Sequence, residues 1–141
     1  MSDPRYIHLS AGGELPLLPA HPFKAVVIIE MPVTPEWRDL TSTWLVESGC
    51  RYMMAWGHEC TLWDDSVDWA SLEQFDYGNS PDAPFVMTTW HDKEPLSEVL
   101  WFAGYAASHP DIMLEQLILI HIAPQGEQAR ILKAFREARS G

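Results

Sequence analysis

The 141-residue sequence is poor in cysteine and lacks any long run of apolar residues. Its two cysteines, Cys50 and Cys60, do not form a CxxC pair and are too few for a disulfide-stabilised scaffold, which favours reduced thiols in the cytoplasm. No apolar run approaches the roughly eighteen residues of a membrane span, and the first residues lack the basic and then apolar pattern of an export signal. These absences predict a soluble, cytoplasmic protein with no membrane partner.

Basic residues are also scarce, since 9 lysines and arginines stand against 20 acidic residues and give a formal net charge of −11. Nucleic acids are bound through basic side chains that displace counterions, so this composition argues against a nucleic-acid partner. Residues 52–115 contain twelve of the acidic residues and one basic residue, Lys93. The charge therefore points to a basic protein as the partner.

The motifs that bind common cofactors are absent. The segment that follows the first predicted strand, residues 31–35, reads MPVTP, so there is no G-x-G-x-x-G loop for a dinucleotide phosphate. The sequence also lacks a G-x-x-x-x-G-K-[ST] loop, a G-x-S-x-G elbow and an H-E-x-x-H helix. We therefore expect no bound cofactor and no metal site.

Strand and helix patterns alternate along the chain. Residues 25–29 form an apolar, β-branched run that is typical of a strand buried on both faces. Thr34 and Pro35 predict a helix start, as N-cap and first helical residue, and Gly49 predicts its end. By the same reasoning, strands are expected at residues 25–29, 50–56, 85–90 and 114–122, and helices at residues 34–49, 64–75, 95–108 and 127–138.

This alternation implies right-handed crossovers and a sheet covered on both faces. The predicted fold class is a small Rossmann-like or flavodoxin-like three-layer α/β sandwich with about four mainly parallel strands. We expect a strand order of 2-1-3-4, with the topological switch point between the first and third strands. Residues 1–23 are rich in proline, which predicts an irregular arm with at most a short extended piece at residues 6–9. The arm is expected to pack on a single domain at residues 24–141.

Ligands of parallel sheets bind beyond the carboxyl ends of the strands, and several reactive side chains fall there. An imidazole or carboxylate at such an edge could act as a general base, and a thiol with a histidine could act as a nucleophile or bind Zn²⁺. Asp92 or a neighbouring residue could instead have only a structural role, as the cap of the following helix. The catalytic candidates are Glu30, His58, Cys60, His91 and Asp92.

Glu30 directly follows the first buried strand, where an ionised carboxylate needs a partner. An ion pair with Arg38 or Arg51 would stabilise the turn between strand and helix, and a ligand cation is the functional alternative. His121 lies inside the last predicted strand and is interpreted as a core or edge histidine with satisfied hydrogen bonds.

Tryptophans alternate with acidic residues between positions 56 and 69. If Trp63 and Trp69 were exposed, they would be aromatic anchors surrounded by acids, as at the hot spot of an interface with a basic protein. If both rings filled the core, the acids would only solvate a helix. The candidate partner-binding residues are Glu59, Trp63, Asp64, Asp65, Asp68 and Trp69.

Three segments carry a resemblance to a known family: GCRYMMAWG at residues 49–57, DSVDW at residues 65–69 and TTWH at residues 88–91. With Trp44 and Leu45, they resemble an uncharacterised family of small bacterial α/β proteins over residues 24–123. This resemblance supports the fold and implies no activity. In size and charge the chain is also similar to immunity proteins and inhibitors as a class.

Two functional hypotheses follow from these observations. The leading one is a non-enzymatic, immunity- or inhibitor-like module that presents an acidic aromatic face to a basic protein. The alternative is a small hydrolase-like enzyme with a polar rim at the carboxyl ends of the strands.

Overall fold

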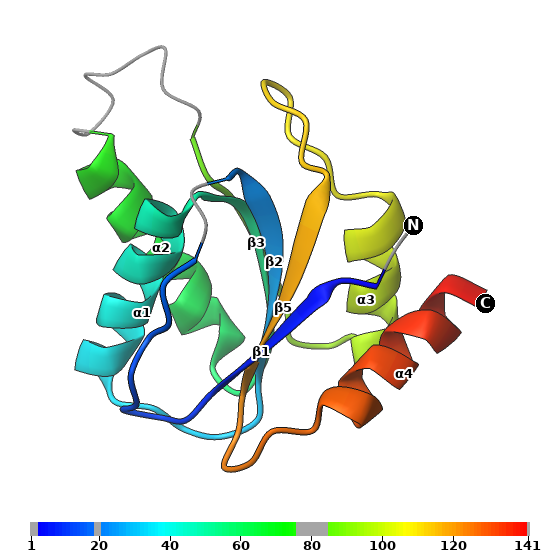
Figure 1. Ribbon diagram of the computed structural model, residues 1–141. Helices are drawn as coiled ribbons and strands as arrows, with labels where there is room; N and C mark the ends of the chain where they lie inside the picture. The colour runs from blue at the N-terminus through cyan, green and yellow to red at the C-terminus, as the bar shows by residue number, and fades with distance from the viewer. Residues whose placement is uncertain (1–2, 19–20, 76–84, 141) are drawn as a thin grey trace.

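In the residues that the structure describes, five parallel strands form one sheet with a pair of helices on each face (Figure 1). The computed structural model describes residues 3–18, 21–75 and 85–140. The strands are β1 (Arg5–Leu9), β2 (Phe23–Ile29), β3 (Cys50–Gly57), β4 (Met87–His91) and β5 (Gln116–Ile122). The helices are α1 (Pro35–Ser48), α2 (Cys60–Gln74), α3 (Leu96–Tyr105) and α4 (Gln128–Ser140). The predicted α/β class, with a parallel sheet between helical layers, is confirmed.

The strand order is β1-β5-β2-β3-β4, which differs from the order expected from the sequence. We expected β2 between β3 and β4, but Val27 of β2 pairs with Ala55 of β3 and with Ile120 of β5. The physical reason is burial, because β5 is apolar on both faces, whereas β4 carries the exposed Trp90 and suits an edge. The switch point therefore lies between β2 and β5.

The proline-rich arm contributes more than the expected short extended piece. Residues 5–9 form the edge strand β1, in which Ile7 pairs with Ile120 of β5. Further along the arm, the carbonyl oxygens of Gly13 and Pro16 accept hydrogen bonds from the indole nitrogens of Trp37 and Trp44 of α1, at 3.0 and 2.7 Å. The arm is thus one edge of the sheet and part of the core.

Helix α1 has the predicted ends. The Thr34 hydroxyl accepts a hydrogen bond from the Trp37 amide at 3.2 Å, and Gly49 ends the helix in the left-handed region with φ of 112°. Helix α2 starts at Cys60, one turn before the expected residue 64, and Glu59 takes the N-cap position. The extra turn is stabilised by tertiary packing, since Cys60 and Trp63 are both buried in it.

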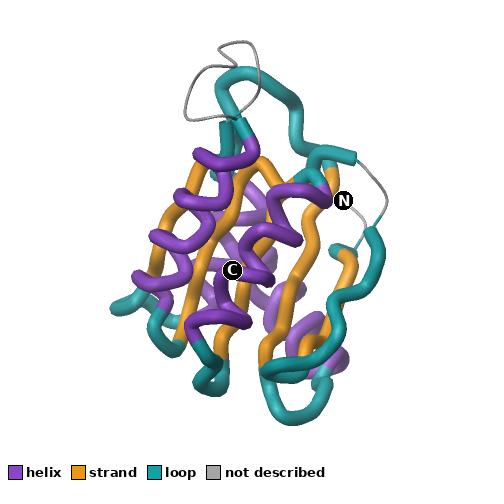
Figure 2. The backbone as a smooth tube through the Cα atoms, turned by 90° about the vertical axis from the view of Figure 1, so that its left-hand side faces the viewer, coloured by secondary structure: helices purple, strands orange, loops and turns teal. Residues whose placement is uncertain are grey.

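The two helical layers bury separate cores. Helices α1 and α2 cover one face of the sheet and α3 and α4 cover the other, and Figure 2 shows the first side with helices lying over the strands. Trp63 is the largest fully buried side chain in the first core, and Phe135 is the largest in the second. None of the helices in the described residues is long and apolar enough to cross a membrane.

Candidate functional site

A charged network around the buried His121 occupies the switch point between β2 and β5. Glu30 follows β2, and its carboxylate accepts a hydrogen bond from Nε2 of His121, in β5, at 2.6 Å. Arg130 of α4 bonds the same carboxylate oxygen and also donates to Glu127 at 2.8 Å. The histidine is fully buried, while the Glu30 side chain is 28% exposed. This is the edge at which parallel sheets bind ligands.

The edge strand β1 closes this network through Tyr6. Its hydroxyl accepts a hydrogen bond from the Glu127 amide at 2.9 Å and lies 2.7 Å from Nδ1 of His121. Because an ionised carboxylate only accepts hydrogen bonds, Nε2 of His121 carries a proton that faces Glu30, and Nδ1 shares a second hydrogen bond with the Tyr6 hydroxyl. The side chains of Tyr6, His121, Glu30 and Arg130 are therefore linked in one hydrogen-bonded chain.

The network favours the ionised form of the Glu30 carboxyl. Burial acts to raise the pKa of this carboxyl, but hydrogen bonds from His121 and Arg130 together lower the pKa below its ordinary value of 4.5. Oxygen or nitrogen atoms of Glu30, His121 and Glu127 lie within 4.8 Å of one another, a spacing that a metal ion could use. The guanidinium of Arg130 already bonds both carboxylates, so a metal would have to displace it.

The partner expected for Glu30 was wrong. Arg38 instead lies 3.5 Å from Glu59, and Arg51 donates to the carbonyl oxygens of Val46 and Cys50. The reason is the strand order, because β5 beside β2 brings His121 and the start of α4 to Glu30. His121 has satisfied hydrogen bonds, as expected.

The thiol and the two rim histidines do not converge. Cys60 lies in the core under α1 and α2, where burial raises the pKa of its thiol. The His91 ring faces the opposite side of the sheet, 5.8 Å from the Phe102 ring of α3. His58 is exposed and lies 3.2 Å from Glu59. In the described part of the chain, no hydrogen bond joins Cys60 to either imidazole.

The His91 ring is positioned by short-range contacts. Its Nε2 lies 2.8 Å from the Thr89 hydroxyl, and its Nδ1 lies 3.2 Å from Glu94. Asp92 is exposed, and Pro95 rather than Asp92 occupies the N-cap position of α3. In the described residues, the rim therefore holds separate polar groups at Glu30, at His91 and at His58 with Glu59.

The two tryptophans of α2 have opposite environments. Trp63 is 0% exposed and packs edge-on against Trp37, with ring centroids 6.4 Å apart, so its expected place on a surface was wrong. Its neighbour Asp64 is also buried, and that burial raises the pKa of the carboxyl. Trp69, by contrast, is 61% exposed. The hydrophobic packing of α2 on β3 and β4 decides which ring turns inward.

A hollow of about 230 Å³ lies beside Trp69, between α1 and α2. In its wall the Ser66 hydroxyl donates to Asp39 at 2.8 Å and lies 2.7 Å from the Ser42 hydroxyl. The hollow is lined by Asp39, Thr43, Ser66, Trp69, Ala70 and Glu73. We use the term acidic face for the outward surface formed by Asp39, Asp65, Asp68, Trp69 and Glu73, all of which are exposed.

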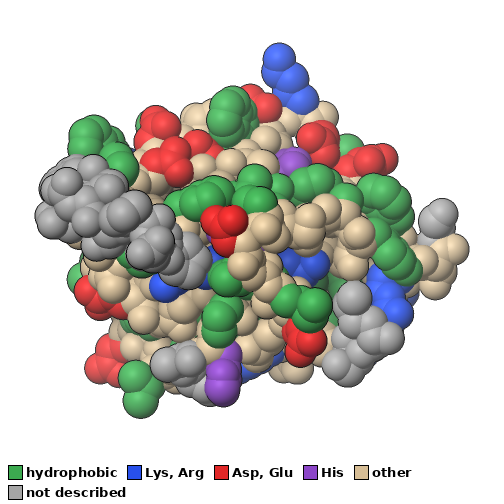
Figure 3. Space-filling model, turned by 90° about the horizontal axis from the view of Figure 1, so that it is seen from above, with side chains coloured by type: hydrophobic (Ala, Val, Ile, Leu, Met, Phe, Trp, Pro, Cys, Tyr) green, Lys and Arg blue, Asp and Glu red, His purple; other side chains and the backbone are tan. Residues whose placement is uncertain are grey.

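Charge on these two helices is strongly one-sided. Their only basic residue is Arg38, which lies beside Glu59. Seen from above, Figure 3 shows acidic side chains at many places on the surface, with basic ones at fewer places and hydrophobic side chains between them. The seven acidic residues of α1 and α2 are Glu36, Asp39, Glu47, Asp64, Asp65, Asp68 and Glu73.

A family model described as "Domain of unknown function (DUF7684)" matches residues 4–138. The chain belongs to this family. No curated protein and no solved structure matches the chain significantly. The DUF7684 match includes β1 and nearly all of α4, so both Tyr6 and Arg130 lie within the family domain.

Sequence patterns did not indicate several residues of these two sites in the DUF7684 domain. Tyr6 lies in a proline-rich arm, and Arg130 and Glu127 fit an ordinary helix start, so only the observed strand order relates them to Glu30. Asp39 and Glu73 could have been found from helical periodicity, because each lies on the polar side of its helix. No local sequence pattern, however, indicates that α1 and α2 lie against each other.

The Glu30 network predicts a pH-dependent contribution to stability. Because its folded-state pKa is lowered, ionised Glu30 stabilises the fold above pH 4.5, and this stabilisation is lost as the pH falls through the folded-state pKa. We expect Glu30→Gln to lower the free energy of unfolding by about 1–2 kcal/mol at neutral pH. The difference between wild type and variant should shrink below pH 4.5.

Urea unfolding at a series of pH values measures this difference. Glu47→Gln is the matched control, since it neutralises an exposed carboxylate of α1. If the two variants gave parallel curves across the acidic range, Glu30 would have no special role in acid stability.

Proposed function

We propose that this domain is a non-enzymatic, immunity- or inhibitor-like binding module whose acidic face binds a basic protein. The observation that carries the proposal is the exposed Trp69 beside a hollow with Asp39 and Glu73 in its wall. Tryptophan is enriched at the energetic centres of interfaces, where a large ring is buried at low entropic cost. Here the ring is available and is surrounded by charge of one sign.

The hollow suits a lysine or arginine side chain of the partner. The cation would lie near the carboxylates of Asp39 and Glu73 and could pack on the indole of Trp69, which attracts cations through its ring face. Asp65 and Asp68 extend the negative charge along α2 and would accelerate association with a basic surface.

The rim at the carboxyl ends of the strands supports the enzymatic alternative less well. Its strongest cluster, Glu30 with His121 and Arg130, uses its polar groups on one another. The Cys60 thiol is buried, and the His91 ring lies on the other face of the sheet. A hydrolase site would need a nucleophile and a base within hydrogen-bond reach.

The test is quantitative capture from a lysate of the source cell on immobilised full-length chain. Wild type should retain a basic protein, and Trp69→Ala should weaken its binding at least about 30-fold when the affinity is then measured with the purified pair. Asp39→Asn with Glu73→Gln should also weaken binding, and the association rate should fall as salt rises.

The matched control is Trp90→Ala, which removes a half-exposed tryptophan from the edge strand β4. This variant should retain the same partner with unchanged affinity. If Trp69→Ala retained the partner as well as wild type does, or if binding were insensitive to salt, the acidic face would not be the binding surface.

A further inference from the structure

One acidic side chain of α2, Asp64, is buried without a positively charged partner. It is only 6% exposed, and its Oδ1 atom has no hydrogen-bond partner among the described residues. In the same part of the chain, no basic side chain forms an ion pair with it. A buried carboxylate is ordinarily paired or coordinates a metal, because burial removes the water that stabilises its charge. Asp64 therefore lacks a cation.

The neighbours of Asp64 increase this need for positive charge. Asp68 follows one helical turn later, and the Thr88 hydroxyl of β4 donates to its carboxylate at 2.7 Å. The same hydroxyl lies within reach of Asp64, but a hydroxyl has only one proton to donate. Two carboxylates of like charge thus share one donor, an arrangement that is unfavourable between positions i and i+4 of a helix.

The pKa of Asp64 agrees with this arrangement. Burial raises the pKa of its carboxyl, and the negative charges of Asp68 and Asp65 act in the same direction, while the hydrogen bond from Thr88 opposes them. A bound cation would supply the charge that the protein does not provide there and would reverse the effect of the neighbouring acids.

The chemistry of the three side chains indicates which kind of cation fits. Carboxylate and hydroxyl oxygens are the ligands that Mg²⁺ and Ca²⁺ prefer, and Mg²⁺ is commonly held by one or two carboxylates while it keeps several waters. Asp68 is exposed, Thr88 is partly exposed, and β4 is an edge strand. An ion bound by the buried Asp64 could therefore reach its site from solvent and keep part of its water shell.

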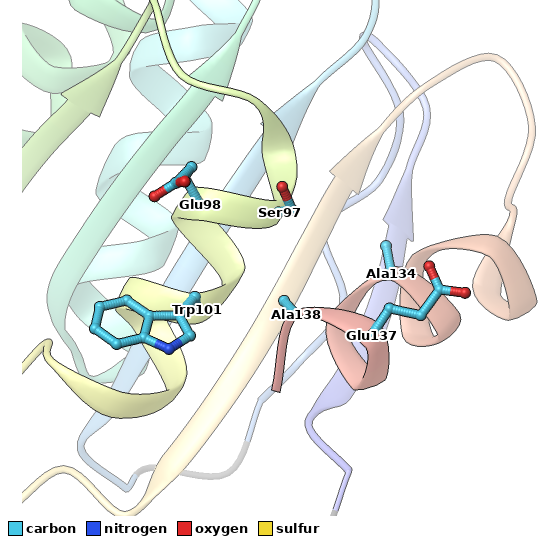
Figure 4. Close-up of a pocket in the computed structure, with 6 residues that line it drawn as sticks. All are labelled: Ser97, Glu98, Trp101, Ala134, Glu137 and Ala138. Atoms are coloured by element: carbon cyan, nitrogen blue, oxygen red, sulfur yellow. The ribbon is translucent and has the colours of Figure 1, made fainter. Parts of the chain in front are cut away.

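The groove between α3 and α4, with a volume of about 520 Å³, shows by contrast where acids need no ion (Figure 4). Its lining includes Glu98 of α3 and Glu137 of α4, and both residues are exposed to water. Glu137 also lies 3.9 Å from Lys133. Burial without a cation distinguishes Asp64 from these acids.

We propose that Asp64, Asp68 and Thr88 bind a hard divalent cation, Mg²⁺ or Ca²⁺, at the β4 edge of the sheet. Asp64 supplies the buried ligand, Asp68 the exposed one, and waters complete the coordination. Sequence motifs predicted no metal site, because a hydroxyl from β4 and two acids of α2 come together only in the folded chain. The inference goes beyond the proposed function, which depends on the hollow beside Trp69.

Isothermal titration calorimetry of the full chain tests the proposal. The protein is freed of metal with a chelator and titrated with MgCl₂ and with CaCl₂ at about 0.15 M salt, which screens exposed charges. Wild type should bind one ion of at least one of the two metals with a dissociation constant of about 1 mM or lower. Asp64→Asn should raise this constant at least about tenfold, and Thr88→Val at least about threefold, because they remove a charge and a ligand oxygen.

Glu47→Gln is the matched control, since it removes one charge from an exposed carboxylate of α1. Its dissociation constant should stay within about twofold of the wild-type value. Equal weakening by Glu47→Gln and Asp64→Asn would mean that ions only collect over the acidic surface, and this result would overturn the proposal. So would the absence of binding up to about 20 mM of either metal, or an unchanged dissociation constant in Asp64→Asn.

Thermal unfolding gives a second readout that does not depend on the heat of binding. At about ten times the dissociation constant, the ion should raise the unfolding midpoint of wild type by about 3 °C or more. In chelator, Asp64→Asn should unfold at the wild-type temperature or above it, because the variant no longer buries an unpaired charge. Its midpoint should not respond to the ion. A response as large as that of wild type would contradict the assignment of Asp64 as a ligand.

Discussion

Replacing Trp63 with alanine should lower the free energy of unfolding by about 3–5 kcal/mol, whereas replacing Trp69 should change it by less than about 0.5 kcal/mol. Both residues belong to α2 and lie six positions apart. Trp63 is completely buried in the core under α1 and α2, so its removal leaves a large cavity. Trp69 is mostly exposed, so its truncation leaves no cavity.

Urea unfolding followed by circular dichroism measures both changes. Trp63→Phe is an informative control, because Nε1 of Trp63 has no hydrogen-bond partner among the described residues. Phenylalanine fills much of the space without that buried N–H, so this variant should lose clearly less stability than Trp63→Ala. Similar losses at positions 63 and 69 would contradict the inward and outward assignment of the two rings, and with it the composition of the acidic face.

Gly57→Ala is expected to be nearly as damaging, with a loss of at least about 2 kcal/mol. Gly57 ends β3 with φ of 107°, in a region that side chains disfavour. A Cβ atom there would lie 2.2 Å from the carbonyl oxygen of Ile29. That oxygen cannot retreat easily, because it accepts a hydrogen bond from the His58 amide at 2.8 Å.

Gly12 provides the matched control for this substitution. It also has a positive φ, of 76°, but a Cβ atom there would meet nothing within 4 Å. Gly12→Ala should therefore show the backbone strain alone, about 1 kcal/mol, and the difference between the two variants measures the steric contact. If urea unfolding showed that Gly57→Ala and Gly12→Ala lose the same stability, the ends of β2 and β3 could move apart without a loss of free energy.

The fold class could be predicted from the sequence because its signals are local. Apolar, β-branched runs such as residues 25–29 indicate buried strands, and the Thr34 cap with Gly49 gives the ends of α1. The order of the strands has no such signal. It depends on which strand is buried on both sides, and β5 takes the place beside β2 that was expected for β4.

The candidate sites were predictable only in part, for the same reason. Glu30 was correctly expected to need a partner, but that partner comes from α4, about a hundred residues further along the chain. In α2 the pattern of tryptophans and acids did not show which ring turns inward, since burial of Trp63 also depends on Trp37 of α1. Only tertiary packing separates Trp63 from Trp69.

The position of β5 in the sheet affects the order in which the strands can pair during synthesis. β5 is the last strand in the chain, but it lies between β1 and β2, the first two. Tyr6 and His121, which face each other across this junction, are 115 positions apart. β2, β3 and β4 can pair in the order in which they are made, whereas β1 has no neighbour until β5 has been made. The pairing of β1 with β5 therefore brings together strands that lie far apart in the sequence.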